Sequence, residues 1–148
     1  MPRTQRGFSL IEVLVALVVL AVGLLGLALL QTMNLRYTKS AEQRTQAVNL
    51  AGELLDTMRS NRSQLAQYAT VPADFAAVVV PADGCAWAKG LSAAVNVARW
   101  RCQVVESLGP DAEATIAIGA DDTVSVTIVW DESRIATTNG QVSIRSVL

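Results

Sequence analysis

The sequence contains no histidine in 148 residues, and aromatic residues make up only 5% of it. Without histidine there is no Ser-His-Asp or Cys-His nucleophile, no His-ligated metal site and no histidine switch near neutral pH. Acidic and basic residues nearly cancel, 13 against 12, which disfavours a nucleic-acid-binding module. We therefore assign no catalytic residues, no metal ligands and no cofactor, and predict a protein that is not an enzyme.

One long apolar run lies near the N-terminus. Residues 13–30 contain no charged or polar side chain, and between Phe8 and this run only Ser9 and Glu12 are polar. A helix over residues 8–30 would be roughly 34 Å long, enough to cross a hydrocarbon core of about 30 Å. Arg3 and Arg6 precede the run, so the positive-inside rule predicts a cytoplasmic N-terminus with the rest of the chain across the membrane.

Two ordinary interpretations of this run compete with a more specific one. A cleaved signal peptide would have a shorter apolar region and an Ala-x-Ala-like site, whereas Gln31 and Thr32 follow the run. A plain signal anchor explains the length and the arginines but not Glu12, because a carboxylate in a spanning helix costs about 2–3 kcal/mol at the bilayer centre. Near the cytoplasmic end this side chain can reach water, so the plain anchor stays open for Glu12 alone.

The residues around Gly7 favour the specific interpretation. Residues 6–14 read Arg-Gly-Phe-Ser-Leu-Ile-Glu-Val-Leu and resemble the class III signal of type IV prepilins, a short basic leader ending in Gly, then Phe, with Glu four residues later. The resemblance implies that prepilin peptidase cuts between Gly7 and Phe8 and methylates the new N-terminus. Residues 1–7 would then be a removed leader, leaving 10 basic against 13 acidic residues after the loss of Arg3 and Arg6.

The new terminus and Glu12 would be two charges in apolar surroundings. Glu12 would lie about 6 Å along the helix axis from the Phe8 amine, and each charge needs a partner there. The amine can pair with Glu12 of its own chain, or Glu12 of an incoming chain can accept the amine of a chain already in a filament. The spacing does not choose between them, and the resemblance to pilins implies the second, with Phe8 and Glu12 acting in assembly.

Past residue 30 the apolar pattern becomes periodic and indicates one face of an amphipathic helix. No proline occurs between Phe8 and Tyr68, so we predict a single helix from Phe8 to about residue 62, or as far as 68. The short polar side chains of residues 60–63 predict a weak stop. The apolar positions are Leu30, Met33, Tyr37, Ala41, Val48, Ala51, Leu55, Met58 and Leu65.

The remaining residues predict a small α+β head. Prolines and glycines indicate a loop over residues 69–90, and Gly109 with Pro110 ends a second helix over residues 91–108. Residues 114–118 and 124–130 alternate with a period of two, and Asn139 with Gly140 is a turn signal before a strand over residues 142–147. We expect three or four antiparallel strands packed with one face on the long helix. The second helix carries Leu91, Val95, Ala98, Cys102, Val105 and Leu108 on its apolar stripe, with Trp100 beside it in the core or at its rim.

Cys85 and Cys102 are the only cysteines, and the predicted topology places both outside the cytoplasm, where disulfides persist. We interpret them as a structural disulfide that stabilises the fold by roughly 3 kcal/mol, with two buried free thiols as the alternative.

Other charged groups could bind ligands, but each has a simpler interpretation. The adjacent carboxylates at residues 121–122 and 131–132 could hold a cation, although turn and surface positions are far more common for such pairs. A basic patch is conceivable from Arg59, Arg62, Arg99 and Arg101, yet solvation on helix surfaces explains them equally well. Six acidic and two basic residues after residue 110 would repel nucleic acid.

The resemblance also implies a function. Residues 54–62, the helix carrying Trp100 and the strand over residues 124–130 are similar to PilV-type minor pilins, the type IV pilus modification proteins. This implies a pilin-like fold with residues 8–30 as the transmembrane half and residues 31–148 as a periplasmic head. It also implies a subunit that primes pilus assembly or lies at the tip, supporting adhesion and twitching motility.

The implied partners are other major and minor pilins, prepilin peptidase, the inner-membrane assembly platform and, before assembly, membrane lipid. The chain would first span the inner membrane once and then enter an extracellular pilus. Two alternatives stay open: a minor pseudopilin of type II secretion, and a single-pass anchored periplasmic binding domain that never polymerises.

Overall fold

The computed structural model describes residues 7–85, 90, 92–132 and 138–148. The basic leader residues Arg3 and Arg6 and the expected first residue of the second helix, Leu91, lie outside these described residues. The chain divides into two compact units, residues 1–38 and residues 39–148, and each is described by itself. The elements are α1 (Leu10–Ser60), η1 (Arg62–Gln64), α2 (Leu65–Tyr68), α3 (Ala93–Leu108), β1 (Glu113–Ile118), β2 (Thr123–Trp130) and β3 (Gly140–Val147).

The N-terminal unit consists of the first part of α1, and its apolar side chains are exposed all around the helix. Leu10 and Leu25, for example, are 88% and 71% exposed, and the most apolar 18-residue window of α1 is 0% buried. An apolar surface of this extent is unstable in water. The helix is long and apolar enough to span a membrane.

The second half of α1 belongs to the C-terminal unit and buries one stripe of side chains in its core. α1 ends at Ser60, whose hydroxyl donates to the Thr57 carbonyl. The weak stop predicted at residues 60–63 is therefore present, but the helix does not run on unbroken to 68, because Asn61 separates it from η1 and α2. The buried α1 residues are Ala47, Leu50, Ala51, Leu54, Leu55, Thr57 and Met58.

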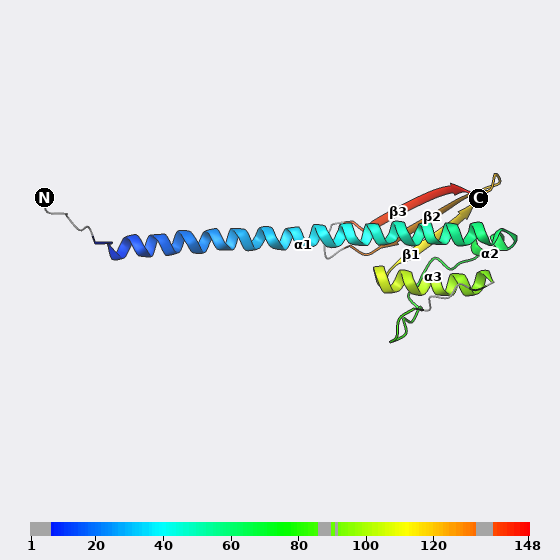
Figure 1. Ribbon diagram of the computed structural model, residues 1–148, viewed down its shortest axis with the longest axis horizontal. Helices are drawn as coiled ribbons and strands as arrows, with labels where there is room; N and C mark the ends of the chain where they lie inside the picture. Colours follow the sequence, from blue (N-terminus) through cyan, green and yellow to red (C-terminus); the bar gives the residue numbers. More distant parts are fainter. Residues whose placement is uncertain (1–6, 86–89, 91, 133–137) are drawn as a thin grey trace. The chain divides into compact units, whose positions relative to one another are not determined.

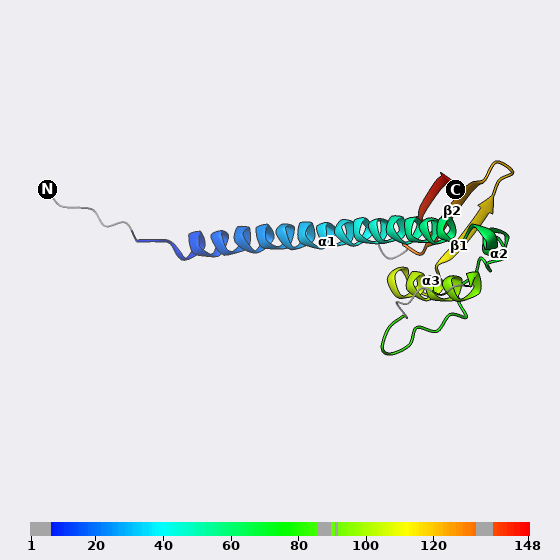
Figure 2. The same ribbon diagram turned by 45° about the vertical axis from the view of Figure 1, so that its right-hand side comes forward.

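Helix α3 runs alongside the second half of α1 in both views of the ribbon (Figures 1 and 2). Its first turn is held by Ser92, whose side chain accepts a hydrogen bond from the Val95 amide, and by Gln64, which accepts one from the Ala93 amide at 2.7 Å. Its last residue is Leu108. The next residue, Gly109, has a φ of 105°, a backbone conformation that glycine adopts without the steric strain that other residues would have. Trp100 is 1% exposed and lies in the core.

The buried face of α3 agrees with the predicted apolar stripe only in part, since Cys102, Val105 and Leu108 are buried as predicted. Val95 is 54% exposed, whereas the polar residues Asn96, Arg99 and Gln103 are buried. Asn96 can be buried because its side-chain amide is hydrogen-bonded to the backbone of Gly90. Its Oδ1 accepts from the Gly90 amide at 2.8 Å, and its Nδ2 donates to the Gly90 carbonyl at 3.0 Å. Polar side chains with specific partners thus replace apolar ones on this face.

Among the described residues, three strands form one antiparallel sheet in the order β1-β2-β3. On the central strand β2 every second residue is buried, ending with Trp130, so one face of the sheet joins the core that contains α1 and α3. Gly140 is the first residue of β3 and pairs with Trp130, although the sequence pattern placed it in a turn. The predicted α+β fold, a long N-terminal helix with a small antiparallel sheet, is confirmed, and of the three or four expected strands the described residues contain three.

Candidate assembly and processing site

The predicted cleavage point lies just before the first turn of α1. Gly7 is exposed, and Phe8 is 84% exposed. The backbone begins its helical pattern at once, because the Ser9 carbonyl accepts from the Glu12 amide at 3.1 Å. Because this segment is exposed and not helical, a peptidase can bind it in an extended conformation.

Glu12 lies in the first turn of α1, exposed among apolar neighbours. It forms no ion pair within the described residues. Its carboxylate is at the helix N-terminus, where the macrodipole favours negative charge. One open groove on the helix surface contains both Phe8 and Glu12, together with Val13, Ala16, Leu17 and Leu20. The groove can therefore receive an apolar surface that carries one positive charge.

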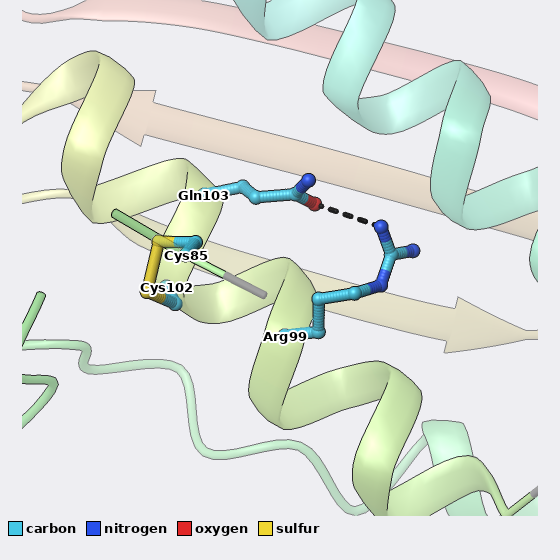
Figure 3. The surroundings of a disulfide bond; sticks show 4 residues. All are labelled: Cys85, Arg99, Cys102 and Gln103. Carbon is cyan, nitrogen blue, oxygen red and sulfur yellow. Dashed lines mark hydrogen bonds between the residues drawn. A yellow bond between two sulfur atoms is a disulfide. The ribbon is translucent and has the colours of Figure 1, made fainter. Parts of the chain in front are cut away.

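The two cysteines are joined. Cys85 and Cys102 form a disulfide with a Cα–Cα distance of 5.8 Å across a sequence separation of 17 residues, which attaches the loop before α3 to the helix (Figure 3). Both residues are buried. The same loop carries Phe75, whose ring meets that of Trp100 edge to face. The disulfide and this aromatic contact together hold the loop against α3.

Arg99 does not belong to a basic surface patch. Figure 3 shows its side chain leaving α3 beside Gln103 and away from the disulfide. Its guanidinium is 2.7 Å from the Glu53 carboxylate on α1, and the Arg99 side chain is 4% exposed. Arg59 pairs with Asp56, and Arg101 lies over the ring of Phe75. Three of the four arginines considered from the sequence thus have separate structural contacts.

The adjacent carboxylates differ in role. Asp121 and Asp122 lie in the turn between β1 and β2, and Asp122 has a φ of 55°. Glu132 is 3% exposed and accepts hydrogen bonds from Trp130 Nε1 at 3.1 Å and from Ser40 on α1 at 3.0 Å. Sequence reasoning missed this buried acceptor, because an acidic pair after a strand indicates a turn. Among the described residues no group of three potential ligands is placed to hold a metal ion.

Comparisons with known families cover the first two thirds of the chain. Residues 2–28 match the family described as "Prokaryotic N-terminal methylation motif", the segment that contains Gly7, Phe8 and Glu12. Residues 29–102, half of the chain, match the family described as "Type IV pilin Tt1218". No curated protein and no solved structure matches the chain.

Proposed function

Because the chain belongs to the type IV pilin family, we propose that it is a minor pilin, a subunit incorporated into a type IV pilus by its N-terminal helix. The observation that carries the proposal is the apolar first part of α1, which no described residue covers and which bears one carboxylate, Glu12, in the groove beside the predicted mature N-terminus. Such a surface requires lipid first and other helices afterwards.

Processing is the first step of the proposed mechanism. Prepilin peptidase would cut between Gly7 and Phe8, and the match to the methylation motif supports this site. Cleavage leaves an amine at Phe8 and removes a basic leader that would otherwise hold the N-terminus at the cytoplasmic face. The amine and Glu12 then become the two charges of the apolar segment.

Docking is the second step. Glu12 of an incoming subunit would accept the Phe8 amine of a subunit already in the pilus, while the surrounding apolar side chains pack on neighbouring helices. Both charges are costly in an apolar environment until they are paired. The pairing therefore favours a defined position of each new helix along its neighbour and disfavours others.

The family implies the cellular setting of this proposal. The chain would cross the inner membrane once with its N-terminus in the cytoplasm and residues 31–148 in the periplasm, and would later leave in an extracellular pilus with other major and minor pilins. A PilV-type role in priming assembly, in adhesion and in twitching motility is what the resemblance of residues 54–62, of the helix that carries Trp100 and of strand β2 to PilV-type minor pilins implies. In this proposal the chain is the substrate of the peptidase and a structural subunit, and it catalyses no step itself.

The proposal is tested by the composition of purified pili. Pili are sheared from cells that produce the chain, and peptides of the chain are sought by mass spectrometry together with its N-terminal mass. We expect a small amount of a chain that starts at methylated Phe8. A chain that retains Met1 in cells with active peptidase, or one that is absent from pili and from their assembly intermediates, contradicts the proposal and leaves a tethered domain.

A further inference from the structure

We propose that Arg36 and Tyr37 form a headgroup anchor on α1, which binds the phosphate of anionic phospholipids in the leaflet opposite the N-terminus while the subunit waits in the membrane. The inference rests on the membrane-anchored state proposed above. It adds a binding site and a ligand class to the apolar helix, at a position beyond the run that spans the hydrocarbon core.

The position of Arg36 along the helix matches the thickness of a bilayer. Helix α1 starts at Leu10, and 26 residues at 1.5 Å each place Arg36 about 39 Å further along the axis. A bilayer is about 40–45 Å thick when its headgroup regions are included. With the first turn at the cytoplasmic face, the apolar run fills the hydrocarbon core and Arg36 reaches the opposite headgroups.

The helix on both sides of Arg36 fits an interfacial environment. Before it, the Thr32 hydroxyl donates to the Ala28 carbonyl at 3.0 Å, and after it, the Thr38 hydroxyl donates to the Asn34 carbonyl at 2.9 Å. These hydroxyl donors are satisfied within the helix and need no water there. Leu35 is 72% exposed, so an apolar side chain continues the lipid-facing surface up to the anchor.

The two anchor side chains have the chemistry of a headgroup site. Tyr37 is 68% exposed, and tyrosine is enriched where membrane meets water because its ring is apolar and its hydroxyl is polar. Arg36 is exposed and forms no ion pair within the described residues. Its planar guanidinium can bind a phosphate through two parallel hydrogen bonds. The charge complementarity therefore favours an anionic lipid over a neutral surface.

Cysteine accessibility locates the anchor. The only two cysteines of the chain are joined in the disulfide, so a single introduced cysteine is the only thiol that the maleimide can label. The full chain is placed in nanodiscs of phosphatidylcholine with phosphatidylglycerol, and residues 20 and 31–41 are replaced one at a time and treated with a membrane-impermeant maleimide. We expect protection at residue 20 and through Leu35, and labelling from residue 38 onward. Labelling that already begins at Gln31 contradicts the anchor.

Lipid retention tests the ligand. In native mass spectrometry of chains released from these nanodiscs, Arg36→Gln should retain about five-fold less phosphatidylglycerol than the unchanged chain. Arg36→Lys should retain an intermediate amount, because it keeps the charge but loses the two parallel hydrogen bonds. Arg145→Gln, which removes an exposed arginine from β3, is the matched control and should change nothing. Equal retention by Arg36→Gln overturns the inference, as does protection of residues 36–37 that persists in a phosphate-free detergent, because a second copy would then cover them.

Failure of the anchor and failure of the proposed function give different results. If the helix spans the bilayer without this anchor, residue 20 remains protected, but Arg36→Gln and its control Arg145→Gln retain the same amount of phosphatidylglycerol. A chain that is labelled at residue 20 as well does not span the bilayer, and that result contradicts the membrane-anchored state itself.

Discussion

The guanidinium of Arg99 on α3 lies 2.7 Å from the carboxylate of Glu53 on α1, and the two side chains are unequally exposed, at 4% and 31%. A carboxylate left alone at this site can still reach water, whereas a guanidinium left alone cannot. Glu53→Ala should therefore lower the free energy of unfolding by about 3 kcal/mol, and Arg99→Met by about 1 kcal/mol or less.

Thermal unfolding of the full chain in detergent micelles measures this asymmetry, with the fluorescence of the buried Trp100 and Trp130 as the signal. Glu42→Ala is the control, since it removes an ion pair with Lys39 in which both side chains are 52% exposed; its effect should stay below about 0.5 kcal/mol. Equal losses for Glu53→Ala and Arg99→Met would show that Arg99 is hydrated in solution.

Gly140 and Gly52 provide a matched pair of glycines. A Cβ on Gly140 would lie 2.2 Å from Cε2 of the buried Trp130 ring, whereas a Cβ on Gly52 would meet nothing within 4 Å. Gly140→Ala should therefore destabilise the C-terminal unit by about 2 kcal/mol or more, because the indole must move in a packed core. Gly52→Ala should stabilise it by up to about 1 kcal/mol, since the position is inside a helix. The same unfolding measurement decides, and a loss for Gly52→Ala would contradict this account.

The disulfide should contribute strongly to stability. Reduction of the Cys85–Cys102 bond frees a loop whose ends are 17 residues apart, and should lower the free energy of unfolding by about 3 kcal/mol on the loop-entropy estimate. Unfolding with and without dithiothreitol measures the effect. The double variant Cys85→Ser with Cys102→Ser should be as unstable as the reduced chain and should not respond to the reductant. A response in that variant would show that the reductant acts elsewhere.

Features that repeat along the sequence were predictable. The alternation of residues 124–130 identified β2 and the side that it buries, because a strand exposes every second residue to the same face. The end of α1 followed from the short polar residues after Met58, which compete with helical hydrogen bonds. The disulfide followed from composition and topology alone, since only two cysteines were present to pair.

Features that depend on one specific partner were not predictable. The burial of Asn96 requires the backbone of Gly90, and the burial of Arg99 requires Glu53, 46 positions away on another helix. Periodicity assigns such polar residues to the surface, so it placed Val95 on the buried face of α3, where Asn96 lies instead, although it placed Val105 and Leu108 there correctly. Glu132 is similar, because its burial depends on Ser40. The assembly role of Glu12 was inferred from the motif that surrounds it and not from its exposed position in the first turn of α1.

The last prediction concerns this carboxylate. Glu12→Ala makes the apolar segment of α1 more apolar, so the chain should still insert into the membrane and should still be cut before Phe8. It should then be at least ten-fold depleted from sheared pili, because a pairing worth about 1.4 kcal/mol or more in docking is lost. Glu12→Asp retains the charge on a shorter side chain and should enter pili at an intermediate level.

Two controls separate docking from processing. Val13→Ala changes a neighbour in the same groove without removing a charge, and should enter pili normally. Gly7→Trp places a bulky residue at the predicted cleavage point, and should accumulate in the membrane as a chain seven residues longer than the mature form. The N-terminal mass in membranes and the amount in pili are measured for each variant. If processed Glu12→Ala enters pili as well as the unchanged chain does, the carboxylate pairs within its own subunit or not at all, and the helix docks through apolar packing alone.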